Sequence, residues 1–189
     1  MWNDMSVFLG KWIGYYEDVV PNELCNDIID YTVESKELSP SKYSTHAGES
    51  ARSAQRVYMD DVWFRFGEDK YYEEMKEYTL KVLSIYQKVH PVVCQRYTDF
   101  RVNRYSSGGF MSEHIDNIHH SHGQQYGYPH LSVLLFLNED YEGGEFVVAD
   151  NEYKTEKGSA IIFPSNFMFP HKVNKIEYGT RWSVVSWLM

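Results

Sequence analysis

The stretch LSVLLFLNEDYEGGEFVV, residues 131–148, decides the fold. It holds two short runs of apolar residues, and Gly143-Gly144 separates them. Short apolar runs bounded by glycine predict β-strands joined by turns. After Pro91 the apolar period changes from helical to two along the rest of the chain. We therefore predict strands over the following ranges: 97–105, 130–138, 144–149, 159–163 and 180–188. Many short strands with glycine turns favour a β-sandwich or a barrel.

Before Pro91 the sequence pattern predicts helices instead of strands. Residues 20–35 and 68–89 predict helices, and the second carries one apolar stripe at helical spacing. The stripe consists of Tyr71, Met75, Tyr78, Val82, Ile85 and Val89. Helices gathered upstream of the strands would cover one face of the sheet. Residues 36–56 are polar and predict a long loop or a loose hairpin. The part from 40 to 56 fits either a substrate lid or an ordinary surface loop.

Length and composition narrow the class of protein. The chain has 189 residues, 43% of them hydrophobic and 24% charged, which predicts one globular domain and excludes a disordered chain. No apolar run approaches the roughly 20 residues of a transmembrane helix, and the start MWNDMSVFLGKW has no signal-peptide pattern. Two cysteines make no disulfide framework, so we expect a cytoplasmic protein. The net charge of -9 weighs against nucleic acid as a partner.

His114-Ile115-Asp116 is a candidate for metal binding. Residues two apart in an extended chain point the same way, so this imidazole and this carboxylate could converge on one ion. His171 could supply a third ligand, although on its own it reads as a hydrogen-bonded histidine at a strand end. Two histidines and one carboxylate leave coordination positions free, which suits Fe(II); Zn(II) would accept the same ligands.

Arg181 follows His171 by ten residues. A strand running back beside the His171 strand would bury Arg181, and a buried guanidinium needs an anion whose carboxylate matches its fork. Ser183 would point to the same side. A core ion pair between Arg181 and a glutamate is the alternative.

Taken together, these motifs resemble a known family. H-x-D, then G-G-E at 143–145, then a Pro-His pair ending at His171, then T-R-W-S at 180–183 occur in one order on strand-like segments. Over about residues 95–188 the sequence resembles the prolyl-hydroxylase branch of the Fe(II)- and 2-oxoglutarate-dependent oxygenases. The stretch at 131–148 is more similar to the microbial and phage prolyl-hydroxylase-like proteins. The stretch YGTRWSVVSW, residues 178–187, resembles a strand of the oxygen-sensing prolyl hydroxylases.

The resemblance implies an α+β fold. Its core would be a double-stranded β-helix (jelly roll) with supporting N-terminal helices. Residues 1–189 would form a single oxygenase domain, with a helix-rich part over about 1–92 and the jelly-roll core over about 93–189.

The resemblance also assigns roles to residues. The iron ligands would be His114, Asp116 and His171, with no catalytic side chain beyond them. The 2-oxoglutarate site would include Arg181, Ser183 and Tyr105. Related hydroxylases often have a tyrosine that helps to hold 2-oxoglutarate where this chain has Phe136, so Ser183 or Tyr105 would compensate, or the cosubstrate is held differently. Trp187 would lie near the substrate.

The implied activity is hydroxylation of a prolyl residue in a peptide or protein, with release of succinate and CO2. The cofactors would be Fe(II), 2-oxoglutarate and O2, with ascorbate as a further candidate. The same chemistry on a free amino acid, a small molecule or a nucleobase is an alternative. A jelly-roll binding module without catalysis is a third hypothesis. The oligomeric state is left open.

For four further histidines and one glutamate, the sequence favours a structural role over a functional one. His130, at a strand start, could touch the substrate main chain or simply cap the strand. His119, His120 and His122 could bind a second metal but fit a polar loop at the mouth of the site better. Glu145 reads as a structural hydrogen-bonding group.

Overall fold

A computed structural model describes residues 8–42, 44–45, 48–49, 55–116 and 129–189. The helices span Asn22–Ser35 (α2) and Tyr72–Gln87 (α3). The strands are β1 (Gly14–Tyr16), β2 (Ser39–Pro40), β3 (Ser44–Thr45), β4 (Gly48–Glu49), β5 (Val57–Tyr58), β6 (Asp60–Phe64), β7 (Phe100–Ser106), β8 (Phe110–His114), β9 (Leu131–Phe136), β10 (Tyr141–Gly143), β11 (Phe146–Val148), β12 (Asn151–Tyr153), β13 (Ala160–Pro164), β14 (His171–Val173) and β15 (Ile176–Leu188).

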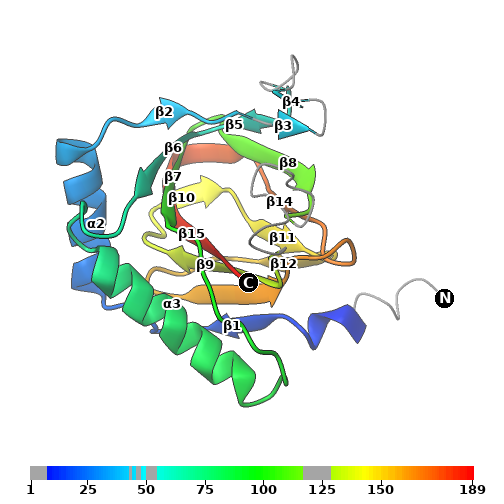
Figure 1. The fold of residues 1–189 in the computed structure, drawn as a ribbon. Coiled ribbons are helices and arrows are strands. Elements are labelled where there is room, and N and C mark those ends of the chain that lie inside the picture. Colours follow the sequence, from blue (N-terminus) through cyan, green and yellow to red (C-terminus); the bar gives the residue numbers. More distant parts are fainter. Residues whose placement is uncertain (1–7, 43, 46–47, 50–54, 117–128) are drawn as a thin grey trace.

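Two antiparallel sheets face each other. The larger, 8-stranded sheet has the order β1-β13-β9-β15-β7-β6-β2, with β10 paired to β15. The smaller, 5-stranded sheet has the order β12-β11-β14-β8-β5. Figure 1 shows α2 and α3 outside the larger sheet, with the smaller sheet on the other side. This arrangement confirms the predicted jelly roll with supporting helices.

Strand β9 shows how the sequence builds the two layers of the core. All six of its residues are buried, and they alternate between the two faces of the larger sheet. Val133 and Leu135 pack in the core beneath the helices, together with Ile28 of α2 and Met75 of α3. Phe136 points the other way, into the core between the sheets. Because side chains alternate along a strand, one apolar run fills both layers.

The predicted helices are confirmed with shorter bounds. Helix α3 begins at Tyr72 because Tyr71 is left-handed, with φ 66, and it ends at Gln87. Val89 of the predicted stripe therefore lies beyond the helix and is 74% exposed. The described part of the chain contains no helix that is both long and apolar enough to cross a membrane.

The last strand is longer than predicted. Strand β15 begins at Ile176, whereas the predicted strand begins at residue 180. Gly179 lies inside the strand with φ +83, and a Cβ there would come within 2.8 Å of the Asp140 carbonyl oxygen. The glycine allows β10 to pair closely with β15. The strand expected at His171 is present as β14, whereas the prediction missed the following strands: β1, β2, β5, β6, β8, β10 and β12.

Candidate metal centre

The three candidate metal ligands meet on two neighbouring strands of the smaller sheet. His114 is the last residue of β8, His171 is the first of β14, and the two are paired in the sheet register. Figure 1 shows these two strands side by side. A register shift between His171 and Val173 marks a bulge, a device that re-aims side chains beside functional sites. One ligand atom each of His114, Asp116 and His171 lies within 4.8 Å of the other two. The centre can therefore hold one ion.

Backbone carbonyls orient both imidazoles. The Nδ1 of His114 lies 2.9 Å from the carbonyl oxygen of Ser112. The Nδ1 of His171 lies 3.2 Å from the carbonyl oxygen of Phe169. Since a carbonyl only accepts, Nδ1–H donates in each case, and Nε2 keeps its lone pair for a metal. The two Nε2 atoms lie 3.6 Å and 3.4 Å from the Asp116 carboxylate oxygens.

The electrostatics of the centre also favour a cation. Burial, followed by the neighbouring His171 charge, lowers the pKa of His114 to about 4, so this ring is neutral at pH 7. Burial alone would raise the pKa of Asp116, but the charge and hydrogen bond of His171 outweigh it and hold that pKa well below its usual range. Burial would lower the pKa of His171, but Asp116 raises it more strongly. The centre therefore presents a buried carboxylate that attracts positive charge.

Arg181 lies on β15 in the larger sheet and is fully buried. Its Nη1 donates to the Ser183 hydroxyl over 3.3 Å, whereas its Nε and Nη2 have no hydrogen-bond partner among the described residues. Among the described residues, no carboxylate lies within 4.0 Å of this guanidinium, so the structure does not contain the alternative core ion pair there. A buried, uncompensated guanidinium is costly, and an anionic ligand would offset that cost.

Two rings flank Arg181. The guanidinium carbon lies 5.3 Å from the Tyr105 ring centroid and 5.2 Å from that of Phe136. Tyr105 is paired with Arg181 in the register of β7 and β15, and Ser183 is paired with Phe136 of β9. The predicted cosubstrate residues Arg181, Ser183 and Tyr105 are thus neighbours on one face of the larger sheet.

A wall of phenylalanine rings lies beside the metal ligands. The His171 ring centroid lies 4.9 Å from that of Phe163 and 5.8 Å from that of Phe146. Both phenylalanines are essentially inaccessible to water. Phe146 was not singled out in the sequence, although it follows the G-G-E motif directly. The wall keeps water away from one side of the centre.

Two buried serines near Asp116 were also missed. Ser132 donates to Oδ2 of Asp116 over 2.6 Å, and its oxygen lies 2.8 Å from the Ser165 hydroxyl. Both serines are fully buried. Ser132 is the one polar residue in the apolar run 131–137, and that interruption was the available signal.

Of the remaining candidate residues, one lies close to the metal centre and the others do not contact it or lie outside the described residues. Trp187 is paired with Ser132 in the sheet register, which puts it close to the metal centre. The side chain of His130 is exposed, while its backbone N–H donates to Leu188. Glu145 accepts a hydrogen bond from Asn174 over 3.1 Å, as expected of a structural group. The cluster His119, His120 and His122 lies outside the described residues, as does much of the segment 40–56.

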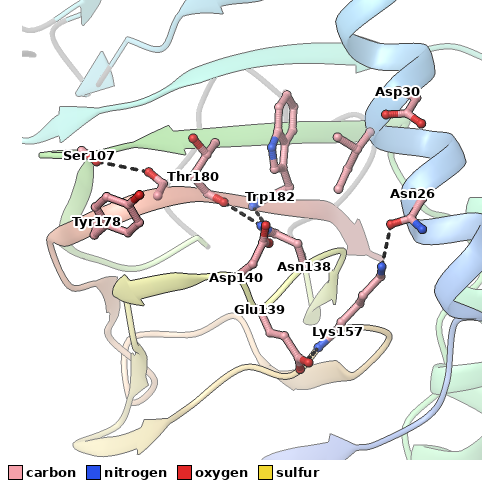
Figure 2. Close-up of a pocket in the computed structure, with 12 residues that line it drawn as sticks. Asn26, Asp30, Ser107, Asn138, Glu139, Asp140, Lys157, Tyr178, Thr180 and Trp182 are labelled. Carbon is pink, nitrogen blue, oxygen red and sulfur yellow. Dashed lines mark hydrogen bonds between the residues drawn. The ribbon is translucent and has the colours of Figure 1, made fainter.

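A groove lies on the other face of the larger sheet, away from the metal centre. It is an open groove of about 990 Å³ between α2 and β15, shown in Figure 2. Its polar groups are largely satisfied: Asn138 donates to Asp140 and to the Thr180 carbonyl, and Lys157 donates to Asn26. Trp182 lines it and points away from the side that carries Arg181 and Ser183. The groove is therefore separate from the metal centre.

Two histidines and one carboxylate would leave coordination positions open on a bound ion. This ligand set, here in a jelly roll, is typical of mononuclear non-haem metal sites. Residues 100–189 match the family model described as the 2OG-Fe(II) oxygenase superfamily. This part of the chain is similar to that superfamily, in agreement with the resemblance recognised in the sequence.

Relatives with curated descriptions agree. The chain is 32% identical over 133 residues to a PKHD-type hydroxylase of Crocosphaera subtropica, covering 64% of this chain and 57% of that protein. It is 37% identical over 92 residues to a PKHD-type hydroxylase of Shewanella oneidensis, covering 46% of this chain and 40% of that protein. The chain thus spans about half the length of the curated relatives that it matches.

Solved structures share the fold. A prolyl-4-hydroxylase of Pseudomonas putida superposes with a TM-score of 0.72 at 16% identity, over 100% of this chain and 98% of that one. A Trichoplax adhaerens prolyl hydroxylase, solved with a hypoxia inducible factor peptide fragment, gives a TM-score of 0.73 at 16% identity, over 99% and 88%.

Proposed function

We propose that this protein is an Fe(II)- and 2-oxoglutarate-dependent dioxygenase that hydroxylates a prolyl residue in a peptide or protein. The observation that carries the proposal is the pairing of a two-histidine, one-carboxylate centre with the buried Arg181, whose Nε and Nη2 lack partners in the part of the chain that the structure describes. The reaction would convert substrate, O2 and 2-oxoglutarate into hydroxylated substrate, succinate and CO2. The relatives named as hydroxylases support the prolyl substrate.

Each part of the site has a distinct task in this proposal. His114 and His171 would hold the metal through Nε2, and Asp116 through its carboxylate. Bound Fe(II) would supply the oxidising chemistry, with O2 as the oxidant and 2-oxoglutarate as the donor of two electrons, so no protein base is needed. Arg181 would bind the distal carboxylate of 2-oxoglutarate, with help from Ser183 and Tyr105. These residues fit the group because Nε and Nη2 of the buried Arg181 have no acceptor among the described residues, and Arg181 faces the core between the sheets.

The proposal also covers the substrate residues, the domain boundaries and the cellular location. Trp187 would lie beside the substrate, and His130 would lie at the exposed rim. We take residues 1–189 as one domain because α2 and α3 share a core with the larger sheet. The free thiols of Cys25 and Cys94 support a cytoplasmic location, where cysteines stay reduced.

The test is an anaerobic titration followed in the visible spectrum. We expect a weak charge-transfer band only when both Fe(II) and 2-oxoglutarate have been added. Arg181→Ala should lose the band at the same concentrations, because the distal carboxylate loses its partner. Arg104→Ala is the matched control, since Arg104 lies on the other face of the neighbouring strand and pairs with Asp60. Metal binding without a band in the wild type would overturn the proposal.

A further inference from the structure

The groove between α2 and β15 lies on the face of the larger sheet that points away from the metal centre. Three segments line it, which are α2, β15 and the turn between β9 and β10. They contribute the following side chains, among others: Ile29, Asp30, Glu139, Asp140, Tyr178 and Trp182. Figure 2 shows side chains from these segments around one common space. With a volume of about 990 Å³, the open groove has room for several side chains of an extended polypeptide.

The amides and the one lysine of the groove are bonded to other groups of this chain. Asn138 donates to Oδ1 of Asp140 over 2.6 Å, and its own Oδ1 accepts the backbone N–H of Trp182 over 2.7 Å. The ammonium group of Lys157 donates to Oδ1 of Asn26 over 2.6 Å. These groups hold the walls of the groove together, which leaves the carboxylates and the aromatic side chains to contact a ligand.

Negative charge dominates the lining. Asp30, Glu139 and Asp140 are exposed, and none of the three forms a salt bridge with another described residue. They also do not gather within 4.8 Å of one another, as the metal ligands do, so they are not placed to chelate one ion. Separate carboxylates along a groove favour a ligand with several separate positive charges.

Apolar surface lies between these carboxylates. Tyr178 is 71% exposed, and Ile29 is partly buried beside it in the lining. The guanidinium carbon of Arg104 lies 5.9 Å from the Trp182 ring centroid, so an aromatic ring of this face already contacts a cation. Aromatic rings attract cations, and the long stems of arginine and lysine pack on apolar surface while their charged ends stay in water. Basic side chains therefore match both the charge and the apolar surface of the groove.

We propose that this groove is a docking site for an extended, basic segment of a partner polypeptide. The stems of its arginine or lysine side chains lie against Ile29 and Tyr178, and their charged ends reach Asp30 and Glu139. The docking site goes beyond the proposed hydroxylase activity, because it lies on the opposite face of the sheet and requires neither the metal nor 2-oxoglutarate.

The first test removes two of the carboxylates. The probe is a fluorescein-labelled octapeptide of alternating glycine and arginine, and its binding is followed by fluorescence anisotropy at low ionic strength. Asp30→Asn combined with Glu139→Gln should raise the Kd about tenfold, because two charge contacts are lost. The matched control is Glu73→Gln combined with Glu77→Gln, which removes the same charge from exposed positions on α3 and should change the Kd by less than about twofold.

The control identifies the source of any attraction. If the two double variants weaken binding equally, the peptide responds to the net charge of -9 and not to the groove, and the proposal is wrong. The Fe(II)–2-oxoglutarate band should be the same in both double variants, since neither touches the metal centre. A missing band in the wild type would count against the proposed function alone.

The second test concerns the exposed ring. Tyr178→Ala should raise the Kd for the same peptide about threefold, whereas Tyr178→Phe, which keeps the ring, should leave it unchanged. Because Tyr178 is exposed, both variants should fold. If Tyr178→Ala binds the peptide as well as the wild type does, the peptide does not lie in the groove.

The third test uses the wild type alone and does not depend on any variant. The glycine–arginine octapeptide should bind, with an affinity that falls as salt is added, and an octapeptide of alternating glycine and glutamate should not bind. Equal binding of the two peptides, or no binding of the basic peptide at low ionic strength, would overturn the docking site.

Discussion

The hydroxyl of Ser132 donates a 2.6 Å hydrogen bond to Oδ2 of Asp116. An ionised carboxylate can only accept, so the single proton of Ser132 is committed to it. The 2.8 Å contact between Ser132 and Ser165 must then have Ser165 as the donor. Two buried hydroxyls thus form a directed chain from the start of β9 and the end of β13 to a candidate metal ligand. The chain fixes the orientation of the carboxylate before any metal binds.

Removing this support should weaken metal binding. We expect Ser132→Ala to lower the affinity for Co(II) or Fe(II) by roughly 10- to 100-fold, as is typical when a hydrogen bond to a metal ligand is lost. Co(II) is the convenient probe, because its visible spectrum reports the ligand environment without turnover. Ser159→Ala is the matched control: Ser159 is equally buried but bonds to Glu156 and Tyr15. Equal Co(II) affinity in both variants would show that the hydrogen bond from Ser132 to Asp116 does not contribute to metal binding.

Metal binding should also stabilise the fold, because a ligand that binds the native state alone shifts the unfolding equilibrium. At 100 times its Kd, Mn(II) should add about 2.7 kcal/mol, which is a rise in Tm of roughly 5–10 °C for a chain of this size. His171→Ala should abolish the shift in a thermal melt. His130→Ala should retain it, since the His130 side chain is exposed and is not part of the centre. Loss of the shift in both variants would contradict the ligand assignment.

Phe136 offers a test of the cosubstrate end. Its ring centroid lies 5.2 Å from the Arg181 guanidinium carbon, where related hydroxylases often have a tyrosine. Phe136→Tyr would place a hydroxyl beside the proposed 2-oxoglutarate carboxylate. One added hydrogen bond is worth about 1 kcal/mol, so the Kd for 2-oxoglutarate should fall about fivefold. The anaerobic titration measures this Kd. A higher Kd would mean that the added hydroxyl clashes with 2-oxoglutarate and forms no hydrogen bond with it.

The sequence predicted the parts of this molecule that depend on local pattern. The apolar runs gave β9, β13 and most of β15, because period-two alternation is a property of neighbouring residues. The candidate ligands His114, Asp116 and His171 could be proposed because their spacing and order resemble a family. Short strands such as β1 and β12, with three residues each, carry too little pattern to be recognised alone.

What the sequence could not give depends on pairing between distant segments. Arg101 and Asp61 are 40 positions apart, and only the register of β6 and β7 brings them to one face. Ser132 and Ser165 meet in the same way, through the pairing of β9 with β13. Neither contact has a local signature, because each is created by the sheet register and not by sequence spacing.

The turn before β11 should be intolerant of any side chain. Gly144 has φ +68, and a Cβ there would lie 2.2 Å from Cδ1 of Ile176 and 3.3 Å from Cδ of Arg181. Gly144→Ala therefore combines backbone strain of about 1–2 kcal/mol with overpacking of about 1–3 kcal/mol. We expect the free energy of unfolding in urea to fall by about 2–5 kcal/mol, and 2-oxoglutarate binding to weaken as Arg181 is displaced.

Gly67 separates the two contributions. It has a similar φ of +73, but a Cβ there would meet nothing within 4 Å. Gly67→Ala should therefore cost only the backbone part, about 1–2 kcal/mol, and leave 2-oxoglutarate binding unchanged. If the two variants lose the same stability, backbone conformation alone explains the glycine, and the close approach to Ile176 and Arg181 contributes nothing.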